Sequence, residues 1–171
     1  MLLTKPLRTK LNLQLTNEPQ LKGKNMDASA SLLLFGLHEN DVQAVRRAVA
    51  QGASLATPAD PTDPELLPPL MLAAKWGSVE MCQVLIELGA NPHYTTHGKL
   101  KITAISSAAY YGQKDVCRYL LETGSTEEEI KFALDLAKSG ATNFGQGSRA
   151  ERYKDTINLL RCALGVSALP S

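Results

Sequence analysis

Apolar residues recur at helical spacing in three segments of the chain that align with one another. The segments are NDVQAVRRAVAQGAS (40–54), GSVEMCQVLIELGAN (77–91) and GQKDVCRYLLETGST (112–126), and each ends in a glycine and one or two small or polar residues. Apolar residues three and four positions apart form one face of a helix. The pattern therefore predicts three similar helices, each of which must bury its apolar face against another element.

A second, shorter helical stretch precedes each segment, at residues 32–39, 68–76 and 103–111. Small side chains in the stretch, such as the pairs Ala73–Ala74 and Ala108–Ala109, allow neighbouring helices to approach closely, and the glycine after each pair permits a left-handed turn. Self-similarity at a period of about 20 to 50 residues is typical of stacked repeats. The chain is thus predicted to fold as two-helix units that stack on one another.

Together the two helices resemble the ankyrin repeat, in which Thr-Pro-Leu-His-x-Ala-Ala-x-x-Gly is followed by an apolar helix and Gly-Ala. The second unit matches this pattern at Pro69, Leu70, Leu72, Ala73, Ala74, Gly77, Leu85, Ile86, Gly89 and Ala90. The third unit matches it at Thr103, Ile105, Ala108, Ala109, Gly112, Val116, Leu120, Leu121 and Gly124. The resemblance implies an all-α ankyrin-repeat solenoid of about four helix-turn-helix units with β-turn or hairpin links.

The expected repeat domain covers residues 27–165, with units at about 30–54, 63–91, 98–125 and 126–165. Its first unit departs from the pattern, because Gly36 and Leu37 replace the paired alanines and Asn40 replaces the glycine. A terminal unit tolerates such changes because it has a neighbour on one side only. The first unit is therefore interpreted as the N-terminal cap.

The links between units are expected to differ. Residues 55–68 are rich in proline and acidic residues, which predicts a stiff, exposed loop. Residues 91–101 have the polar, glycine-containing composition of the hairpin finger that the family uses. This finger is missing after the third unit, where the chain passes directly into a helix capped by Ser125 or Thr126 with Glu128 or Glu129.

The fourth unit diverges most from the repeat. Residues 133–140 keep the shape of the shorter helix, and TINLLRCALG (156–165) is the last helical segment. Residues 141–155 between them are expected to form a mobile loop, made locally basic by Arg149, Arg152 and Lys154. Gly145 and Gly147 in this stretch do not indicate a phosphate-binding loop, because no buried strand precedes them and no GxxxxGK motif follows.

Composition narrows the function classes. The 171 residues carry a net charge of +1, so no overall field favours nucleic acid or an acidic substrate. Cys82, Cys117 and Cys162 have no metal-binding spacing and are interpreted as reduced thiols of the core. The sequence has no apolar run near the roughly 20 residues that a membrane span needs. The expected location is the cytoplasm, with the nucleus as an alternative.

The first 26 residues differ from the rest, with five basic residues and one acid. They are expected to be an extension outside the repeat domain, as are residues 166–171 at the other end. Three roles for residues 1–26 remain open: a docking arm, an idle tail or a mitochondrial presequence. Contact with nucleic acid is expected only through this basic segment, if at all.

No residues in the sequence form a convincing catalytic or metal site. His93 and His97 share one finger, but such a pair binds metal well only from a helix. Ser106 and Ser107 have no base near them in sequence, so a nucleophile is not indicated. The sequence therefore predicts a protein that is not an enzyme and that needs no cofactor or small-molecule substrate.

The resemblance implies that the two residues before each turn glycine point to the concave, partner-facing side. The expected partner-binding residues there are His38, Lys75, Trp76, Tyr110 and Tyr111, joined at the fingertip by His93, Tyr94 and Lys99. Trp and Tyr side chains bury a large area on binding and lose little conformational entropy, which favours contact with another protein. The competing interpretation is that Trp76 or one tyrosine packs against the neighbouring finger.

The sequence thus predicts a non-catalytic module that binds another protein through its concave face and loop tips. The alternative function is a permanent accessory subunit of a larger assembly, anchored by residues 1–26. A protein that is stable alone would favour the module, whereas insolubility in isolation would favour the subunit.

Overall fold

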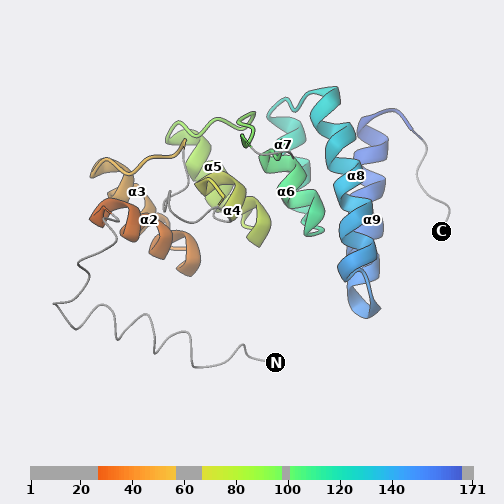
Figure 1. The fold of residues 1–171 in the computed structure, drawn as a ribbon, viewed down its shortest axis with the longest axis horizontal. Helices are drawn as coiled ribbons and strands as arrows, with labels where there is room; N and C mark the ends of the chain where they lie inside the picture. The colour runs from red at the N-terminus through yellow and green to blue at the C-terminus, as the bar shows by residue number, and fades with distance from the viewer. Residues whose placement is uncertain (1–26, 57–66, 98–100, 167–171) are drawn as a thin grey trace.

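The structure is a computed structural model that describes residues 27–56, 67–97 and 101–166. Its helices form four antiparallel pairs that stack in chain order from left to right in Figure 1. The pairs are α2 (Ala28–Glu39) with α3 (Val42–Ala50), α4 (Pro69–Trp76) with α5 (Val79–Glu87), α6 (Ala104–Tyr110) with α7 (Lys114–Glu122), and α8 (Glu127–Phe144) with α9 (Ala150–Ala163). A short 3-10 turn, η1 (Gly147–Arg149), leads into α9. No strand occurs in the described residues, as an all-α solenoid requires.

The stack has two layers. The inner helices α2, α4, α6 and α8 contact one another in order, and the outer helices α5, α7 and α9 do the same behind them. The paired alanines lie where the layers meet, since Ala73, Ala74, Ala108 and Ala109 are at most 1% exposed. Their small side chains permit the close packing of inner helices that the sequence predicted.

The inner helices α2 and α4 end in residues with left-handed backbone, and α6 is followed by one. Gly77 and Gly112 have φ of 84° and 68°, and Asn40 takes φ of 55° at the equivalent point of the first unit. Asparagine is among the few residues with a side chain that adopt this conformation readily. Asn40 therefore replaces the repeat glycine in the first unit without changing the turn.

The link between the second and third units is closed by Thr96 and Ile102. The Thr96 N–H donates to the Ile102 carbonyl, and the Ile102 N–H donates to the Thr96 hydroxyl, both at 3.1 Å. After the third unit, Thr126 and Glu129 form the expected capping box at the start of α8. The predicted acidic loop lies largely outside the described residues, because residues 57–66 are not among them.

The prediction of a mobile loop at residues 141–155 is wrong. Helix α8 continues to Phe144, and α9 already begins at Ala150, so that Arg152 and Lys154 lie on a helix. Only residues 145–149 form the connection between the two helices. The helix does not end at Gly140 as the repeat pattern suggests, because Gly140 is buried inside α8 against Tyr110 and Tyr153.

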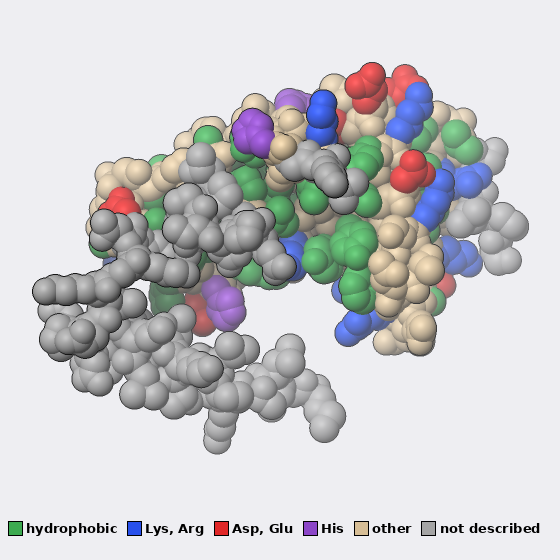
Figure 2. Space-filling view, viewed as in Figure 1, with side chains coloured by type: hydrophobic (Ala, Val, Ile, Leu, Met, Phe, Trp, Pro, Cys, Tyr) green, Lys and Arg blue, Asp and Glu red, His purple; other side chains and the backbone are tan. Residues whose placement is uncertain are grey.

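The fourth pair has a polar outer surface. Charged side chains of both signs lie over the end of the molecule formed by α8 and α9 (Figure 2). Helix α8 also carries the exposed ion pairs Lys131–Glu127 and Lys138–Asp135. The terminal unit of a solenoid has no further neighbour to cover it, so a charged outer surface keeps it in water. This distribution fits α8 and α9 as the C-terminal cap of the described stack.

The cysteines divide into two kinds. Cys82 and Cys117 are fully buried in the core, as predicted, and burial raises the pKa of both thiols to about 12. Cys162 was also predicted to lie in the core, but it is exposed. The physical reason is its place on α9, the last helix among the described residues, where no further described helix covers the side chain.

We expect one of the three thiols to react rapidly with 5,5′-dithiobis(2-nitrobenzoic acid) in the native protein at pH 8, and all three to react in denaturant. The reagent attacks the thiolate, and buried thiols with a pKa of about 12 supply almost none. Absorbance at 412 nm counts the thiols released. The Cys162→Ser variant serves as the control and should remove the rapid phase. Rapid labelling of Cys82 or Cys117 in the folded variant would show that the core opens easily.

Candidate functional site: an aromatic row at the ends of the inner helices

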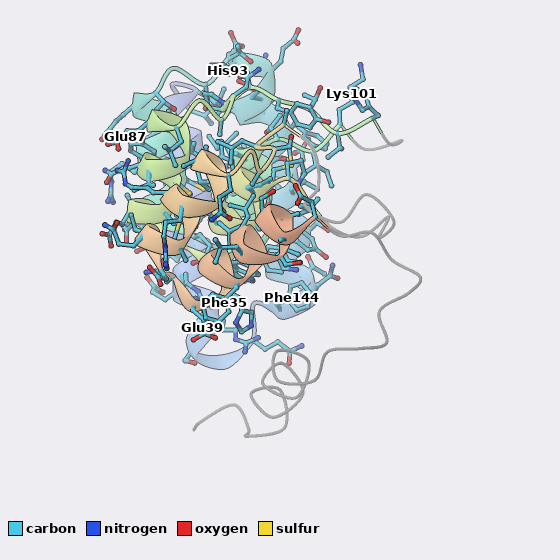
Figure 3. The ribbon with its side chains drawn as sticks, turned by 90° about the vertical axis from the view of Figure 1, so that its left-hand side faces the viewer. Phe35, Glu39, Glu87, His93, Lys101 and Phe144 are labelled. Atoms are coloured by element: carbon cyan, nitrogen blue, oxygen red, sulfur yellow. The ribbon has the colours of Figure 1, made fainter. Side chains whose placement is uncertain are left out.

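The C-terminal ends of the inner helices carry a row of aromatic side chains along one edge of the stack. We call His38, Trp76, Tyr110, Tyr111 and Phe144 the aromatic row. Glu39 and Phe144 mark its two ends on the lower side of the molecule in Figure 3. Helices α2, α4 and α6 stop at equivalent turns, which brings the residues just before each turn to the same edge, and Phe144 reaches this edge on the extension of α8 beyond Gly140.

In the first half of the row, Trp76 contacts the first unit. The imidazole of His38 lies edge-to-face with the indole, with 6.0 Å between ring centroids. Trp76 is nevertheless 44% exposed. Among the described residues, the indole makes its ring contact with His38 of the preceding inner helix, in contrast to the competing interpretation that it packs against the finger.

In the second half of the row, three rings cluster. Tyr110 and Tyr111 lie edge-to-face at 5.1 Å, and Phe144 lies 5.7 Å from Tyr110. Phe144 is also stacked on Tyr111, at 6.3 Å with 14° between the ring planes. These separations are within the range of favourable aromatic pairs. The fourth unit thus extends the row beyond the residues that the repeat pattern supplied.

Sequence reasoning missed Phe144 because residues 141–155 were assigned to a loop. The side chain is 40% exposed, although its ring contacts two tyrosines. The signal that could have revealed it is the lack of proline after Gly140, which leaves the helix free to continue. Nothing local in the sequence indicates that this part of α8 lies beside Tyr110 and Tyr111.

Lys75 joins the two halves of the row. Its ammonium group lies 5.1 Å from the centre of the Tyr111 ring, a cation–π geometry that links α4 to the turn after α6. At the far end, the imidazole of His38 lies 3.2 Å from the Glu39 carboxylate. The edge therefore combines aromatic side chains with the charged groups of Lys75 and Glu39.

Hydrogen bonds fix the tyrosine part of the row. The Tyr110 hydroxyl accepts from the Asn143 amide at 3.2 Å, and the Tyr110 carbonyl accepts from the Tyr153 hydroxyl at 3.0 Å. Tyr153 is only 2% exposed, and this burial raises the pKa of its phenol, against the opposing effect of nearby Arg152. The neutral phenol is the form that donates this hydrogen bond.

The predicted fingertip residues do not join the aromatic row. His93 lies on the opposite, upper side of the molecule in Figure 3, where its imidazole is 3.1 Å from the Glu129 carboxylate. Tyr94 lies edge-to-face with His97 at 6.0 Å. Lys99 is outside the described residues. The structure therefore separates the predicted site residues into an inner-helix set and a fingertip set.

The described residues contain no group of three or more His, Cys, Asp or Glu side chains placed to hold a metal ion. Ser106 and Ser107, for which the sequence does not indicate a nucleophile, have structural roles. Ser106 completes the capping box of α6, and the Ser107 hydroxyl donates to the Met71 carbonyl at 3.1 Å. Among the helices that the structure describes, none combines the length and apolar character that crossing a bilayer requires.

The chain is similar to known proteins in its repeat region. The family described as "Ankyrin repeats (3 copies)" matches residues 22–132 and 70–161. A 73-residue stretch is 36% identical to the "Transient receptor potential cation channel subfamily A member 1 homolog" of Caenorhabditis elegans. That stretch is 40% of this chain and 6% of the channel, so the chain spans a small part of its relative.

Ankyrin repeats are generally protein-interaction modules and are typically non-catalytic. The match extends over most of the described helices, and the four stacked helix pairs have the architecture that the motif implies. By its repeated sequence motif, its stacked helix pairs and its match over residues 22–161, this chain belongs to the ankyrin-repeat family.

Proposed function

We propose that this protein is a non-catalytic module that binds another protein through the aromatic row. The observation that carries the proposal is the continuity of the row across all four units, from His38 to Phe144. Side chains that served only to hold adjacent helices together would be buried between them. Trp76 and Phe144 instead keep about two fifths of their surface in water, at 44% and 40%.

The composition of the row supports a protein partner. Large aromatic side chains dominate the centres of protein interfaces because they bury much apolar area at a small cost in conformational entropy. Contacts within the row already restrict Tyr110, Tyr111 and Phe144, so a partner would lose little affinity to ordering them. The fingertip residues His93 and Tyr94 would contact such a partner only if it also reached the opposite end of the inner helices.

The first test identifies the partner and the face together. Proximity labelling in cells with the full chain is compared with the Trp76→Ala and Phe144→Ala variants. The matched control is Gln83→Ala, which changes an exposed residue on outer helix α5. Proteins labelled by the full chain and the control, but lost with both row variants, are the expected partners.

With such a partner purified, Trp76→Ala is expected to raise the Kd about 30-fold, which corresponds to about 2 kcal/mol. The melting temperature should remain nearly unchanged, because an exposed indole contributes little to the core. Isothermal titration calorimetry and thermal unfolding on the same samples give both quantities. A large loss of stability with unchanged affinity would make Trp76 a packing residue and would exclude the row as the binding face.

A further inference from the structure

The second and third junctions between units share one type of hydrogen bond, which no described residue makes at the first junction. At the second junction, the Lys75 carbonyl accepts from the side-chain amide of Gln113 at 2.9 Å. At the third, the Tyr110 carbonyl accepts from the Tyr153 hydroxyl at 3.0 Å. In both cases the carbonyl lies two residues before the left-handed position, and the donor comes from the following unit.

The same donors also fill the space over the left-handed glycine. A Cβ atom on Gly77 would lie 2.5 Å from the Gln113 side chain, and one on Gly112 would lie 3.2 Å from the Tyr153 ring. Each donor therefore packs directly against the turn while it satisfies the helix carbonyl. At each of these two junctions, a side chain with an apolar body and a hydrogen-bond donor at its end covers the turn glycine, and a smaller pocket of about 220 Å³ lies beside Gly112 and Gln113.

The first junction is built differently. The carbonyl equivalent to those of Lys75 and Tyr110 is that of His38, which again lies two residues before the left-handed residue, here Asn40. Ser78 occupies the repeat position of Gln113. The Ser78 side chain is short, and its hydroxyl donates to the Asn40 side chain at 2.7 Å. Among the described residues, no side chain donates to the His38 carbonyl as Gln113 and Tyr153 do at the other junctions.

A pocket of about 340 Å³ lies at this junction. Leu37 and Met81 give it apolar surface, and Asn40 and Ser78 give it polar surface. His38 and Trp76, the first two members of the aromatic row, complete its lining. Its volume is at the lower end of the range for ligand pockets, so it suits one side chain better than a larger ligand.

We propose that this pocket receives a tyrosine side chain of the partner protein, with the ring against Trp76 and the hydroxyl donating to the His38 carbonyl. The inference rests on the proposed function of the aromatic row. The chain itself provides the precedent, since Tyr153 makes the equivalent contacts at the third junction. An aromatic ring is favoured over a glutamine because the indole and imidazole of the pocket supply aromatic contacts.

None of the tyrosines in this sequence occupies the pocket in the structure. All five tyrosines of the chain lie in the described residues, and none of them lines the pocket. Residues 1–26 contain no tyrosine. The remaining alternative is a tyrosine from a second copy of this chain, which would appear as self-association of the purified protein in analytical ultracentrifugation and would overturn the assignment to a partner.

The test uses p-cresol, the side-chain analogue of tyrosine, with the full chain. In titrations followed by two-dimensional NMR, we expect saturable shifts confined to residues around His38, Asn40, Trp76 and Ser78. Fluorescence of Trp76, the sole tryptophan of the chain, reports the same event. The analogue 4-methylanisole has the same ring but no hydrogen-bond donor. Its affinity should be lower than that of p-cresol by about fivefold or more, because the His38 carbonyl stays unpaired.

The Ser78→Gln variant should abolish p-cresol binding while the protein stays folded, because the new side chain can cover the turn and donate to the His38 carbonyl, as Gln113 covers Gly77 and donates to the Lys75 carbonyl. Helix α7 forms with Gln113 at its N-cap without a side-chain capping bond, so the lost Ser78 cap is tolerable. Ser139→Gln, an exposed change on α8, is the matched control and should bind normally.

Equal binding of p-cresol and 4-methylanisole, shifts scattered over the surface, or unchanged binding to Ser78→Gln would each overturn the inference. These failures differ from failure of the proposed function. If Trp76→Ala and Phe144→Ala abolish the binding of a partner but the full chain does not bind p-cresol, the row is an interface without a tyrosine pocket. If p-cresol binds and no partner depends on the row, the pocket exists but the proposed function is wrong.

Discussion

Tyr153→Ala is expected to destabilise the protein by about 3 to 5 kcal/mol, the range for truncating a fully buried aromatic side chain. The ring is 2% exposed and packs against Gly112 and Gly140, and its hydroxyl holds the Tyr110 carbonyl at 3.0 Å. Its removal leaves a cavity and an unpaired carbonyl at the junction of the third and fourth units. Urea denaturation followed by circular dichroism measures the change.

Tyr153→Phe separates the two contributions. It keeps the ring and removes only the hydrogen bond, so the loss should be about 1 to 3 kcal/mol, the cost of an unsatisfied buried polar group. Hydrogen exchange should show the lost protection concentrated in α8 and α9, since each unit of a solenoid depends mainly on its neighbours. An equal loss for the two variants would mean that the ring contributes no packing energy.

Gly140→Ala is expected to destabilise the protein by about 2 kcal/mol, although the same change inside an ordinary helix stabilises by about 1 kcal/mol. A Cβ atom at this position would overlap the Tyr110 carbonyl oxygen and come within 2.9 Å of the Tyr153 ring. The carbonyl belongs to the backbone and cannot move aside without shifting α6 from α8. The sign of the effect therefore reports whether the two helices are in close contact.

Ser139→Ala is the matched control for Gly140→Ala, because it lies one residue away on the exposed side of α8. It should change the stability by less than about 0.5 kcal/mol, as surface substitutions usually do. Thermal unfolding of the two variants and the full chain gives the comparison. Stabilisation by Gly140→Ala would contradict the close approach of α8 to the end of α6.

The two variants also bear on the aromatic row. Tyr153 and Gly140 hold α8 against Tyr110, and this contact brings Phe144 next to Tyr110 and Tyr111. Loss of the contact should therefore free Phe144 from the row while Trp76 and His38 keep their places. A partner that needs the entire row would then lose affinity even with α2 to α7 folded.

Much of the fold could be predicted from the sequence because its signals are local. The apolar spacing within residues 77–91 and 112–126 fixes one buried face for each outer helix, and Gly77 and Gly112 fix the turns through their left-handed backbone. The capping box of Thr126 and Glu129 likewise lies within four residues. Burial of Cys82 and Cys117 followed from the same helical spacing.

The tertiary structure decided the features of the fold that depend on contacts between residues far apart in the sequence. Gly140 occupies the repeat position of Gly77 and Gly112, yet its helix continues, because packing against Tyr110 and Tyr153 uses the glycine for close approach instead of a turn. Cys162 has the apolar context of a core residue but is exposed, since α9 is the last helix of the described stack and no described helix covers it.

The candidate site likewise has features that the sequence determined and features that only the tertiary structure decided. The sequence by itself determined the helices and the turn positions that carry Trp76, Tyr110 and Tyr111, because each depends on residues within one repeat. Only the tertiary structure decided that Phe144 joins them, that His93 lies at the opposite end, and that Ser78 leaves a pocket beside Trp76. These outcomes depend on side chains that are 33 or more residues apart meeting across a junction, as Asn143 and Tyr110 do. A repeat period fixes which positions face a neighbour, but the size and bonding of the side chains that meet there decide whether the helix carbonyl before the turn is covered and hydrogen-bonded.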